Sequence, residues 1–454
     1  MKRSNTVRFL VLSFLLVSYL PINGAVTTTK LKVKAPFTMP AIRMPDFSNC
    51  KKLVITDFGA VQGDKIKTSQ AIAKAISAAG ESGGGIVVIP PGEWLTAQVH
   101  LKSNVNLHLM KGAVLLFSDN PSDYLPAVHS TWEGLECYNY SPLIYAYQCK
   151  NVAITGEGEV QALMDNWKKW AGRPRAHMNS LKNLYYWAFD NKPVNERNMV
   201  NDSSNLRPQF IQFNRCENIL IDGVSIKNSP FWTIHLYLSK DIVVRNVKVW
   251  AHGHNNDGID PEMSQNILIE NCIFDQGDDA IAVKSGRSPE GWRTKTPSKN
   301  IVIRNCTVKN GHQLLAIGSE LSGGIENIYL NNCVVAHGAK MFHLVFIKTN
   351  ERMGYVKNIH VSNVKAGKID NGILGIETDV LYQWRNLVPT IEKRLTPIKN
   401  IKLNRINASK VEFISRIFGQ KELPVKNVTL INVAADTISS KKHIHENVLK
   451  FKEK

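Results

Sequence analysis

The sequence predicts an all-β solenoid, a parallel β-helix, because a short strand pattern recurs along most of the chain. Each copy begins with Asn or Asp and continues with apolar residues at alternate positions, which is typical of strands. The spacing between copies varies from 23 to 42 residues, which suits coils that carry loops of different length. The copies begin at Asn218, Asp241, Asn266, Asn300, Asn327, Asn358, Asn400 and Asn427, with a weaker copy at Asn151.

A second polar position, five places after each start, predicts a bend between two short strands. Asn stands there in six of the eight copies, and stacked Asn side chains can hydrogen-bond along the solenoid and satisfy the backbone of a turn. One place later, Cys272, Cys306 and Cys333 share a register with valine and isoleucine in the other copies. We therefore expect these cysteines to fill the core. A metal site is the alternative, although the cysteine spacing does not suit zinc.

Residues 1–24 have the pattern of a secretory signal peptide. Basic residues stand at positions 2, 3 and 8, an apolar run extends from Phe9 to Leu20, and small residues follow at Gly24 and Ala25. The apolar run is shorter than the roughly 20 residues that a membrane-spanning helix needs. We therefore expect an exported protein, periplasmic or secreted, with no membrane association.

The elements before the first clear repeat are expected to cap the solenoid. Residues 25–50 are predicted to be an N-terminal extension, and residues 51–454 the β-helix domain. The open end of a solenoid needs a cap, and Thr68–Ala79 has the apolar spacing of a short amphipathic helix that would close the N-terminal end. Gly83–Gly85 precede an apolar run and predict a turn before a strand, not a phosphate-binding loop, because no Gly-Lys-Ser/Thr follows.

Residues 165–207 interrupt the repeat and are predicted to form a long insertion loop. Loops of this length are often functional. We expect an ordered loop that folds onto one end of a cleft, where its aromatic residues could stack on a sugar ring; a surface excursion that packs on itself is the alternative. The aromatic residues are Trp167, Trp170, Tyr185, Tyr186 and Trp187.

The charge balance favours an acidic polymer as the partner. Lys and Arg number 56 and Asp and Glu 38, for a formal net charge of +18. A strongly basic exported protein would meet an acidic polymer outside the cytoplasm. Nucleic acid is the intracellular alternative, and the signal pattern argues against it. The seven cysteines are an odd number, so at least one has no disulfide partner within a monomer.

Carboxylates gather in consecutive predicted coils. Asp257 lies in the coil that starts at Asp241, Asp278 and Asp279 lie in the next coil, and His312 lies in the one after. Asp278 and His312 each stand twelve places after their coil starts, so stacking at ~4.8 Å would place them side by side, with Asp257 on the other flank.

Crowded carboxylates cannot all ionise freely, so at least one pKa should rise. A carboxyl with a raised pKa suits a general acid, and an ionised carboxylate can activate water, which together are what hydrolysis of a glycosidic bond requires. Turn formation by Asp-Gly and Gly-Asp pairs is one alternative, and calcium binding is another.

Four short segments resemble the signature segments of the polygalacturonases, glycoside hydrolase family 28. They are Asn255-Asn256-Asp257, Gly277-Asp278-Asp279, Gly311-His312 and Ile347-Lys348, in the family's order and with similar separations. The resemblance extends from about Asp57 to the C-terminal coils. It implies a right-handed parallel β-helix that hydrolyses pectic polymers with inversion of configuration, without a metal or other cofactor.

The resemblance also implies roles for individual residues. Asp278 would be the general acid, and Asp257 and Asp279 would hold and deprotonate the attacking water. His312 would support the acid. Substrate contacts would come from Lys348, which would bind a uronate carboxylate, and from the first segment through Asn255.

The chain departs from the family pattern at Phe346, where the family has arginine before Ile-Lys. Arginine binds carboxylates through two parallel hydrogen bonds, and phenylalanine cannot. Lys284, Arg287 or Arg352 would have to compensate; the first two follow the Asp pair closely, at a predicted cleft wall.

The function predicted from the sequence is cleavage of α-1,4-galacturonosyl linkages in polygalacturonate by an exported, monomeric enzyme. Exo action is expected because the 165–207 insertion could block one end of the groove and because Lys348–Arg352 resembles exo-type members. A rhamnogalacturonan hydrolase is the alternative that the missing arginine keeps open. A calcium-dependent pectate lyase and a non-catalytic pectin-binding protein are further alternatives.

Overall fold

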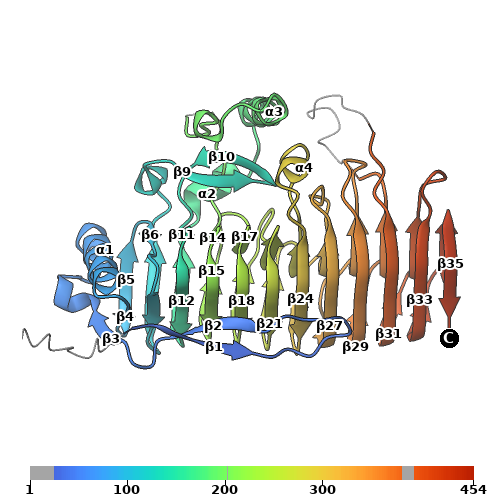
Figure 1. Cartoon of the computed structure of the whole chain (residues 1–454), viewed down its shortest axis with the longest axis horizontal. Helices are drawn as coiled ribbons and strands as arrows, with labels where there is room; N and C mark the ends of the chain where they lie inside the picture. Colours follow the sequence, from blue (N-terminus) through green and yellow to red (C-terminus); the bar gives the residue numbers. More distant parts are fainter. Residues whose placement is uncertain (1–24, 202, 381–392) are drawn as a thin grey trace, which may run out of the picture.

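The computed structural model describes residues 25–201, 203–380 and 393–454, and its fold is the predicted right-handed parallel β-helix (Figure 1). The predicted signal peptide, residues 1–24, lies outside the described residues. No helix in the described part of the chain is both long and apolar enough to cross a membrane.

Each coil contributes strands to three faces of the solenoid, and neighbouring coils pair in parallel register. The first face contains β3 (Lys51–Val54), β4 (Gly85–Ile89), β7 (Val105–Leu109), β12 (Lys150–Gly156), β15 (Glu217–Asp222), β18 (Lys240–Arg245), β21 (Gln265–Glu270) and β24 (Ser298–Arg304). The second contains β5 (Gly92–Thr96), β8 (Ala113–Phe117), β13 (Glu159–Ala162), β16 (Ser225–Lys227), β19 (Lys248–Ala251), β22 (Ile273–Gln276) and β25 (Thr307–Asn310).

Toward the C-terminus, single long strands run through the bend between these two faces. They are β27 (Ile325–Val335), β29 (Val356–Lys368), β31 (Ile398–Val411) and β33 (Val425–Ile438), and β35 (Val448–Glu453) ends the chain. The third face contains β6 (Val99–His100), β11 (Ile144–Tyr147), β14 (Ile211–Asn214), β17 (Ile234–Tyr237), β20 (Ile259–Glu262), β23 (Ile281–Val283), β26 (Gln313–Ile317), β28 (His343–Lys348), β30 (Gly372–Glu377), β32 (Phe413–Phe418) and β34 (His443–Glu446).

Asn residues form ladders at two corners of the coils. The side-chain amide of Asn300 donates to Asn266 at 3.1 Å and accepts from Asn327 at 3.0 Å, and the same bonding continues through Asn358 and Asn400. Asn300 has a φ of 58°, in the left-handed region that Asn tolerates better than most residues. The predicted bend ladder, five places on, is present in part: Asn271 donates to Asn246 and Asn332 donates to Asn305, whereas Asn363 donates to Asn331. The coil starts thus form a second ladder that the sequence analysis did not predict.

The cysteines lie where the register predicts. Cys272, Cys306 and Cys333 are buried, and Cys333 pairs in register with Val364 of the next coil. None of the seven cysteines, all of which lie in the described part of the chain, forms a disulfide. The core that they help to fill runs the whole length of the solenoid.

The N-terminal residues cover one end and one side of the solenoid. Helix α1 (Lys65–Glu81) begins after Asp64, whose side chain accepts from the amide of Lys67, and its predicted apolar face is buried against the first coils. The hairpin β1 (Thr27–Leu31) and β2 (Ile42–Asp46) lies across β15 and β18 on the outside of the first face (Figure 1). There it covers an apolar row that includes Leu220, Val243 and Leu268.

The insertion 165–207 contains helices where the sequence predicted a loop. Its elements are α2 (Asp165–Trp170), α3 (Arg175–Phe189) and the 3₁₀ turn η3 (Val194–Glu196). With the hairpin β9 (Val128–Trp132) and β10 (Leu135–Asn139), α3 encloses a second core that contains Trp132, Leu181 and Tyr185. This unit stands above the third face, over the middle coils (Figure 1). The remaining short helices are η1 (Ile55–Phe58), η2 (Pro121–Tyr124) and α4 (Glu290–Thr294).

Candidate active site

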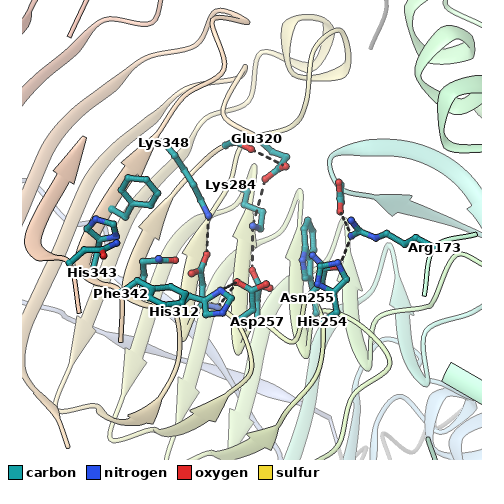
Figure 2. Close-up of a pocket in the computed structure, with 18 of the residues that line it drawn as sticks. Arg173, His254, Asn255, Asp257, Lys284, His312, Glu320, Phe342, His343 and Lys348 are labelled. Atoms are coloured by element: carbon teal, nitrogen blue, oxygen red, sulfur yellow. Dashed lines mark hydrogen bonds and ion pairs between the residues drawn. The ribbon is translucent and has the colours of Figure 1, made fainter. Parts of the chain in front are cut away.

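A pocket of about 480 Å³ opens on the third face, beneath the insertion (Figure 2). It combines carboxylates, cations and aromatic rings from coils that are distant in sequence. The described lining residues are Glu133, Arg173, Trp232, His254, Asn255, Asp257, Asp278, Asp279, Lys284, His312, Gln313, Ser319, Glu320, Phe342, His343, Phe346, Lys348, Asn371 and Arg416.

The carboxylates meet because the loops that carry them stack in register. Asp257 follows β19, Asp278 and Asp279 follow β22, and His312 follows β25. The amide of His312 donates to the carbonyl of Asp278 at 2.8 Å, so pairing between coils continues through the loops. Close approach requires glycine: a Cβ atom on Gly277 would lie 2.5 Å from the amide nitrogen of Gly253 in the preceding coil.

Asp278 and His312 form the predicted pair at the mouth of the pocket. His312 Nδ1 lies 3.0 Å from Asp278 Oδ1, and the amide of Asp279 donates to the same oxygen at 3.0 Å. Burial acts to raise the pKa of Asp278, but the bond and charge of His312 outweigh it and leave that pKa below its usual value. Burial acts to lower the pKa of His312, but the Asp278 carboxylate raises it.

The raised carboxyl pKa that crowding predicts occurs deeper in the cluster, on Asp257 rather than Asp278. Burial, together with the charge of Asp278, raises the pKa of Asp257 to about 8. Asp260 lies beneath, fully buried, and burial and Asp257 raise its pKa well above the usual range. Burial also raises the pKa of Asp279.

Two lysines place positive charge against these carboxylates (Figure 2). Lys284 Nζ lies 3.4 Å from Asp257, 3.5 Å from Asp260 and 3.6 Å from Glu320. Lys348 Nζ donates to Asp279 Oδ2 at 3.3 Å. Each lysine therefore offsets repulsion within the cluster, because opposite charges at this distance favour the ionised forms.

The other predicted substrate-binding residues occupy different surroundings. Asn255 lines the pocket, and its side-chain oxygen accepts from Arg173 at 2.8 Å and from Arg207 at 3.1 Å. Arg287 is buried and ion-paired with Glu133 and Glu320. Arg287 and Arg352 are not among the described lining residues.

Phe346 faces the pocket at the position where the arginine is missing. Its ring stacks on His343, with centroids 4.4 Å apart and planes inclined by 9°. Lys348 Nζ lies 5.9 Å from the centroid of the Phe346 ring. This wall is therefore aromatic, with a cation at its edge.

The aromatic residues of the insertion do not line the pocket. Trp167 is fully buried against Tyr124, and Tyr185 belongs to the second core. None of the five predicted stacking residues is among the described lining residues. Trp167 and Trp170 pack on the solenoid core, Tyr185 and Trp187 pack in the second core, and Tyr186 is exposed. The insertion contributes Arg173 to the site.

Several lining residues were missed by the sequence analysis. Glu133 reaches the pocket from the tip of the β9–β10 hairpin, and Trp232 packs under Lys284, with Nζ 4.5 Å from the ring centroid. No local pattern marks these two. Asp260 and Arg416 could have been found, because each lies in an outward register of the third face.

A metal ion is one further possibility that the geometry allows. One ligand atom from each of Asp278, Asp279 and His312 lies within 4.8 Å of the others. A mixed oxygen and nitrogen set suits a transition metal better than calcium, which takes six to eight oxygens. At Asp279, however, Lys348 already supplies a positive charge.

Comparison with known proteins identifies the family and several similar proteins. The family described as "Glycosyl hydrolases family 28" matches residues 186–452. The crystal structure of a hyperthermoactive exopolygalacturonase from Thermotoga maritima is 34% identical, covers 90% of this chain and 92% of its own, and has a TM-score of 0.83.

Two curated sequences are also similar. A probable polygalacturonase of Vitis vinifera is 28% identical over 86% of this chain and 75% of its own length. An exo-poly-alpha-D-galacturonosidase of Dickeya chrysanthemi is 28% identical over 63% of this chain, and the match spans 50% of that relative.

Proposed function

Because the chain belongs to the glycosyl hydrolases of family 28, we propose that it hydrolyses the α-1,4-galacturonosyl linkages of polygalacturonate. The observation that carries this proposal is the meeting of three carboxylates and a histidine in one pocket that also contains Arg173, Lys348 and Arg416. Cations at a cleft concentrate an anionic substrate and favour its carboxylates over neutral sugars. The net charge of +18 acts in the same direction.

We assign the general acid to Asp278, which would protonate the leaving oxygen. In the free protein this carboxyl is ionised and paired with His312, so the proton to be donated is shared by the pair. Entry of a uronate substrate would exclude water and add negative charge, which raises the pKa of Asp278 and moves the proton from His312 onto the carboxyl. His312 is partly exposed and can take up a new proton from solvent.

Asp257 and Asp279 would hold and deprotonate the attacking water on the opposite side of the scissile bond. The raised pKa of these buried carboxyls suits this role once the group is ionised, because an ionised carboxylate with a raised pKa is the stronger base. Attack from the side opposite the acid would invert configuration, as in glycosidases whose acid and base are separated by a water molecule.

We infer exo action from a wall on one side of the pocket, which the tip of the β9–β10 hairpin and the insertion form. Glu133, at the hairpin tip, pairs with Arg287, whose amide donates to the carbonyl of Gly134 at 3.2 Å. Arg173 and Arg207 fasten the insertion to Asn255. A polymer would meet this wall after entering the site, so it would be cut near one end.

Rhamnogalacturonan is the second candidate substrate, and Phe346 is the observation that favours it. An aromatic wall in place of an arginine suits a sugar that lacks a carboxylate at that position. We further propose that the protein is exported and acts as a monomer, on the basis of its N-terminal residue pattern and its basic charge.

Product analysis tests the proposal. The protein without residues 1–24 is incubated with polygalacturonate and, separately, with de-esterified rhamnogalacturonan, both with a calcium chelator. We expect free galacturonate from polygalacturonate as the first and main product. A ladder of oligomers would overturn exo action, and products from rhamnogalacturonan alone would reassign the substrate. An unsaturated, ultraviolet-absorbing product would indicate a lyase.

A further inference from the structure

We propose that Arg416 binds a carboxylate of the substrate, in a subsite with His343 and Phe346, and so replaces the arginine that is absent at position 346. The inference rests on the proposed function, because it requires a substrate with uronate units. It adds a specificity-determining residue that the family segments do not contain.

The register of the third face places Arg416 in line with Phe346. Phe346 on β28 pairs with Gly375 on β30, and Gly375 pairs with Arg416 on β32. The three residues therefore occupy one outward row, in which Arg416 stands two strands, or ~10 Å, beyond Phe346. Both residues nevertheless line the same pocket.

Gly375 allows the pocket wall to extend from Phe346 to Arg416. A Cβ atom there would lie 2.8 Å from Cδ2 of Phe346 and 2.9 Å from Cδ2 of His343. The stacked rings of Phe346 and His343 thus occupy the space above the glycine and extend the wall toward Arg416. Phe413 completes it, with its ring centroid 5.9 Å from that of His343 and 4.7 Å from the guanidinium carbon of Arg416.

The polar atoms of this wall have unused hydrogen-bonding capacity. Nη2 of Arg416 donates to Oε1 of Glu377 at 2.9 Å. Its Nε atom is buried and has no hydrogen-bond partner among the described residues, and the same is true of both ring nitrogens of His343. Buried donors without partners are costly, and a ligand that satisfies them explains why they persist.

The chemistry of these atoms indicates a uronate unit. The guanidinium group presents parallel donors that match the two oxygens of a carboxylate. Burial, with the charges of Arg416 and Lys348, lowers the pKa of His343 to about 3, so its neutral ring offers one donor and one acceptor to sugar hydroxyls. The face of Phe346 is left for the apolar side of a sugar ring.

A purely structural role for Arg416 can be distinguished from substrate binding by comparing the loss of Arg416 with the loss of Glu377. Glu377 accepts from Arg416, and both side chains are partly exposed. If this ion pair were the only purpose of Arg416, loss of either partner would have the same effect. If Arg416 binds substrate, loss of Glu377 leaves the guanidinium in place, and its effect should be much smaller.

The experiment compares Arg416→Gln, Arg416→Lys and Glu377→Gln with the wild-type chain. On a galacturonate oligomer, we expect kcat/KM of Arg416→Gln to fall about 10- to 100-fold, mainly through KM, because a hydrogen-bonded charge is lost. Arg416→Lys should retain part of the activity, and Glu377→Gln should change kcat/KM less than threefold. Arg405→Gln, an exposed arginine at the bend, is the control for loss of charge.

Binding separates recognition from turnover. The dissociation constant of the same oligomer is measured by calorimetry in an Asp278→Asn background, with and without Arg416→Gln, and folding is checked by circular dichroism. A 10- to 100-fold weaker constant is expected. The inference is overturned if Arg416→Gln matches Arg405→Gln, or if Glu377→Gln causes an equal loss. A wild-type chain that cleaves no galacturonide contradicts the proposed function instead.

Discussion

Two rows of residues run along the same coils and differ in a way that separates fold from function. At one corner, Asn is repeated from Asn266 to Asn427, and each side chain bonds to the one before. Along the outward row of the third face, the residue type varies from coil to coil, and Ala282 and Ala316 are the one identical pair of neighbours in it. That row reads Gln212, His235, Asp260, Ala282, Ala316, Phe346, Gly375 and Arg416.

The two rows differ because identical amides can hydrogen-bond to one another, whereas identical carboxylates repel. An amide both donates and accepts, so identical Asn residues satisfy one another along a stack. Identical carboxylates repel, so a site that needs several of them must interleave cations such as Lys284 and Lys348. Repetition therefore stabilises the solenoid, and variation along the third face and in the loops that lead into it creates the chemistry.

The largest expected effect comes from Asp278→Asn, in the loop that leads into the varied third face. Asparagine cannot donate an acid proton, so kcat should fall by roughly 10²- to 10⁴-fold. Reducing-sugar release from a galacturonate oligomer measures it. Asp275→Asn is the matched control, because Asp275 lies in the same coil but pairs with His252 outside the pocket. Equal activity of the two variants would remove Asp278 from its proposed role.

Asp257→Asn should lower turnover and yet stabilise the fold. Its pKa rises on folding from 3.8 to about 8, so the folded chain retains a proton that the unfolded chain releases. The stability this provides is fully present below pH ~4 and is lost as the pH rises through about 8. Asparagine at position 257 does not ionise, so the variant does not lose this stability as the pH rises.

Thermal unfolding measured across this range checks the sign. The melting temperature of Asp257→Asn should exceed that of the wild type by a few degrees at pH 8, and the difference should vanish near pH 4. Asp278→Asn is the comparison, since the pKa of Asp278 is lowered and its ionised form is already favoured. A lower melting temperature for Asp257→Asn at pH 8 would show that the cluster is not under electrostatic strain.

Asn300→Ala tests the repeated row. Alanine in the left-handed region costs roughly 1–2 kcal/mol, and two side-chain hydrogen bonds worth ~1 kcal/mol each are lost. The free energy of unfolding should fall by about 2–4 kcal/mol in urea denaturation, while kcat/KM of the folded enzyme stays unchanged. Asn300→Gly keeps the backbone conformation accessible and should lose about half as much. An equal loss in both variants would assign the whole effect to the hydrogen bonds.

The same contrast explains how much could be predicted from the sequence. The solenoid was predictable because its rows repeat: Cys306 could be assigned to the core from the valines that replace it in other coils. Asp278 and His312 could be paired because both stand at the same distance from a coil start. Both predictions use only register, and both are confirmed by the structure.

Register could not reveal what enters the site from outside the repeat. Glu133 and Arg173 arrive from a hairpin and an insertion whose own core decides their position, and no periodicity marks them. The insertion contains helices where a loop was predicted, although α3 buries residues at helical spacing, so this signal was present in the sequence and was missed. These residues are His177, Leu181, Leu184, Tyr185 and Ala188. Electrostatics also depends on depth, so the raised pKa belongs to buried Asp257 and not to Asp278 at the mouth.

The smallest effect is expected from Cys306→Val, which replaces one core residue by another that the same row already contains. Cys306 is buried, its thiol is free, and the corresponding residue is Val364 two coils further on. A swap of similar volume in such a row should change the free energy of unfolding by about 1 kcal/mol or less. Urea denaturation with and without a metal chelator measures it. If the chelator greatly lowered the free energy of unfolding of the wild type but not of Cys306→Val, the cysteine row would be a metal site. Its repetition would then not be explained by packing.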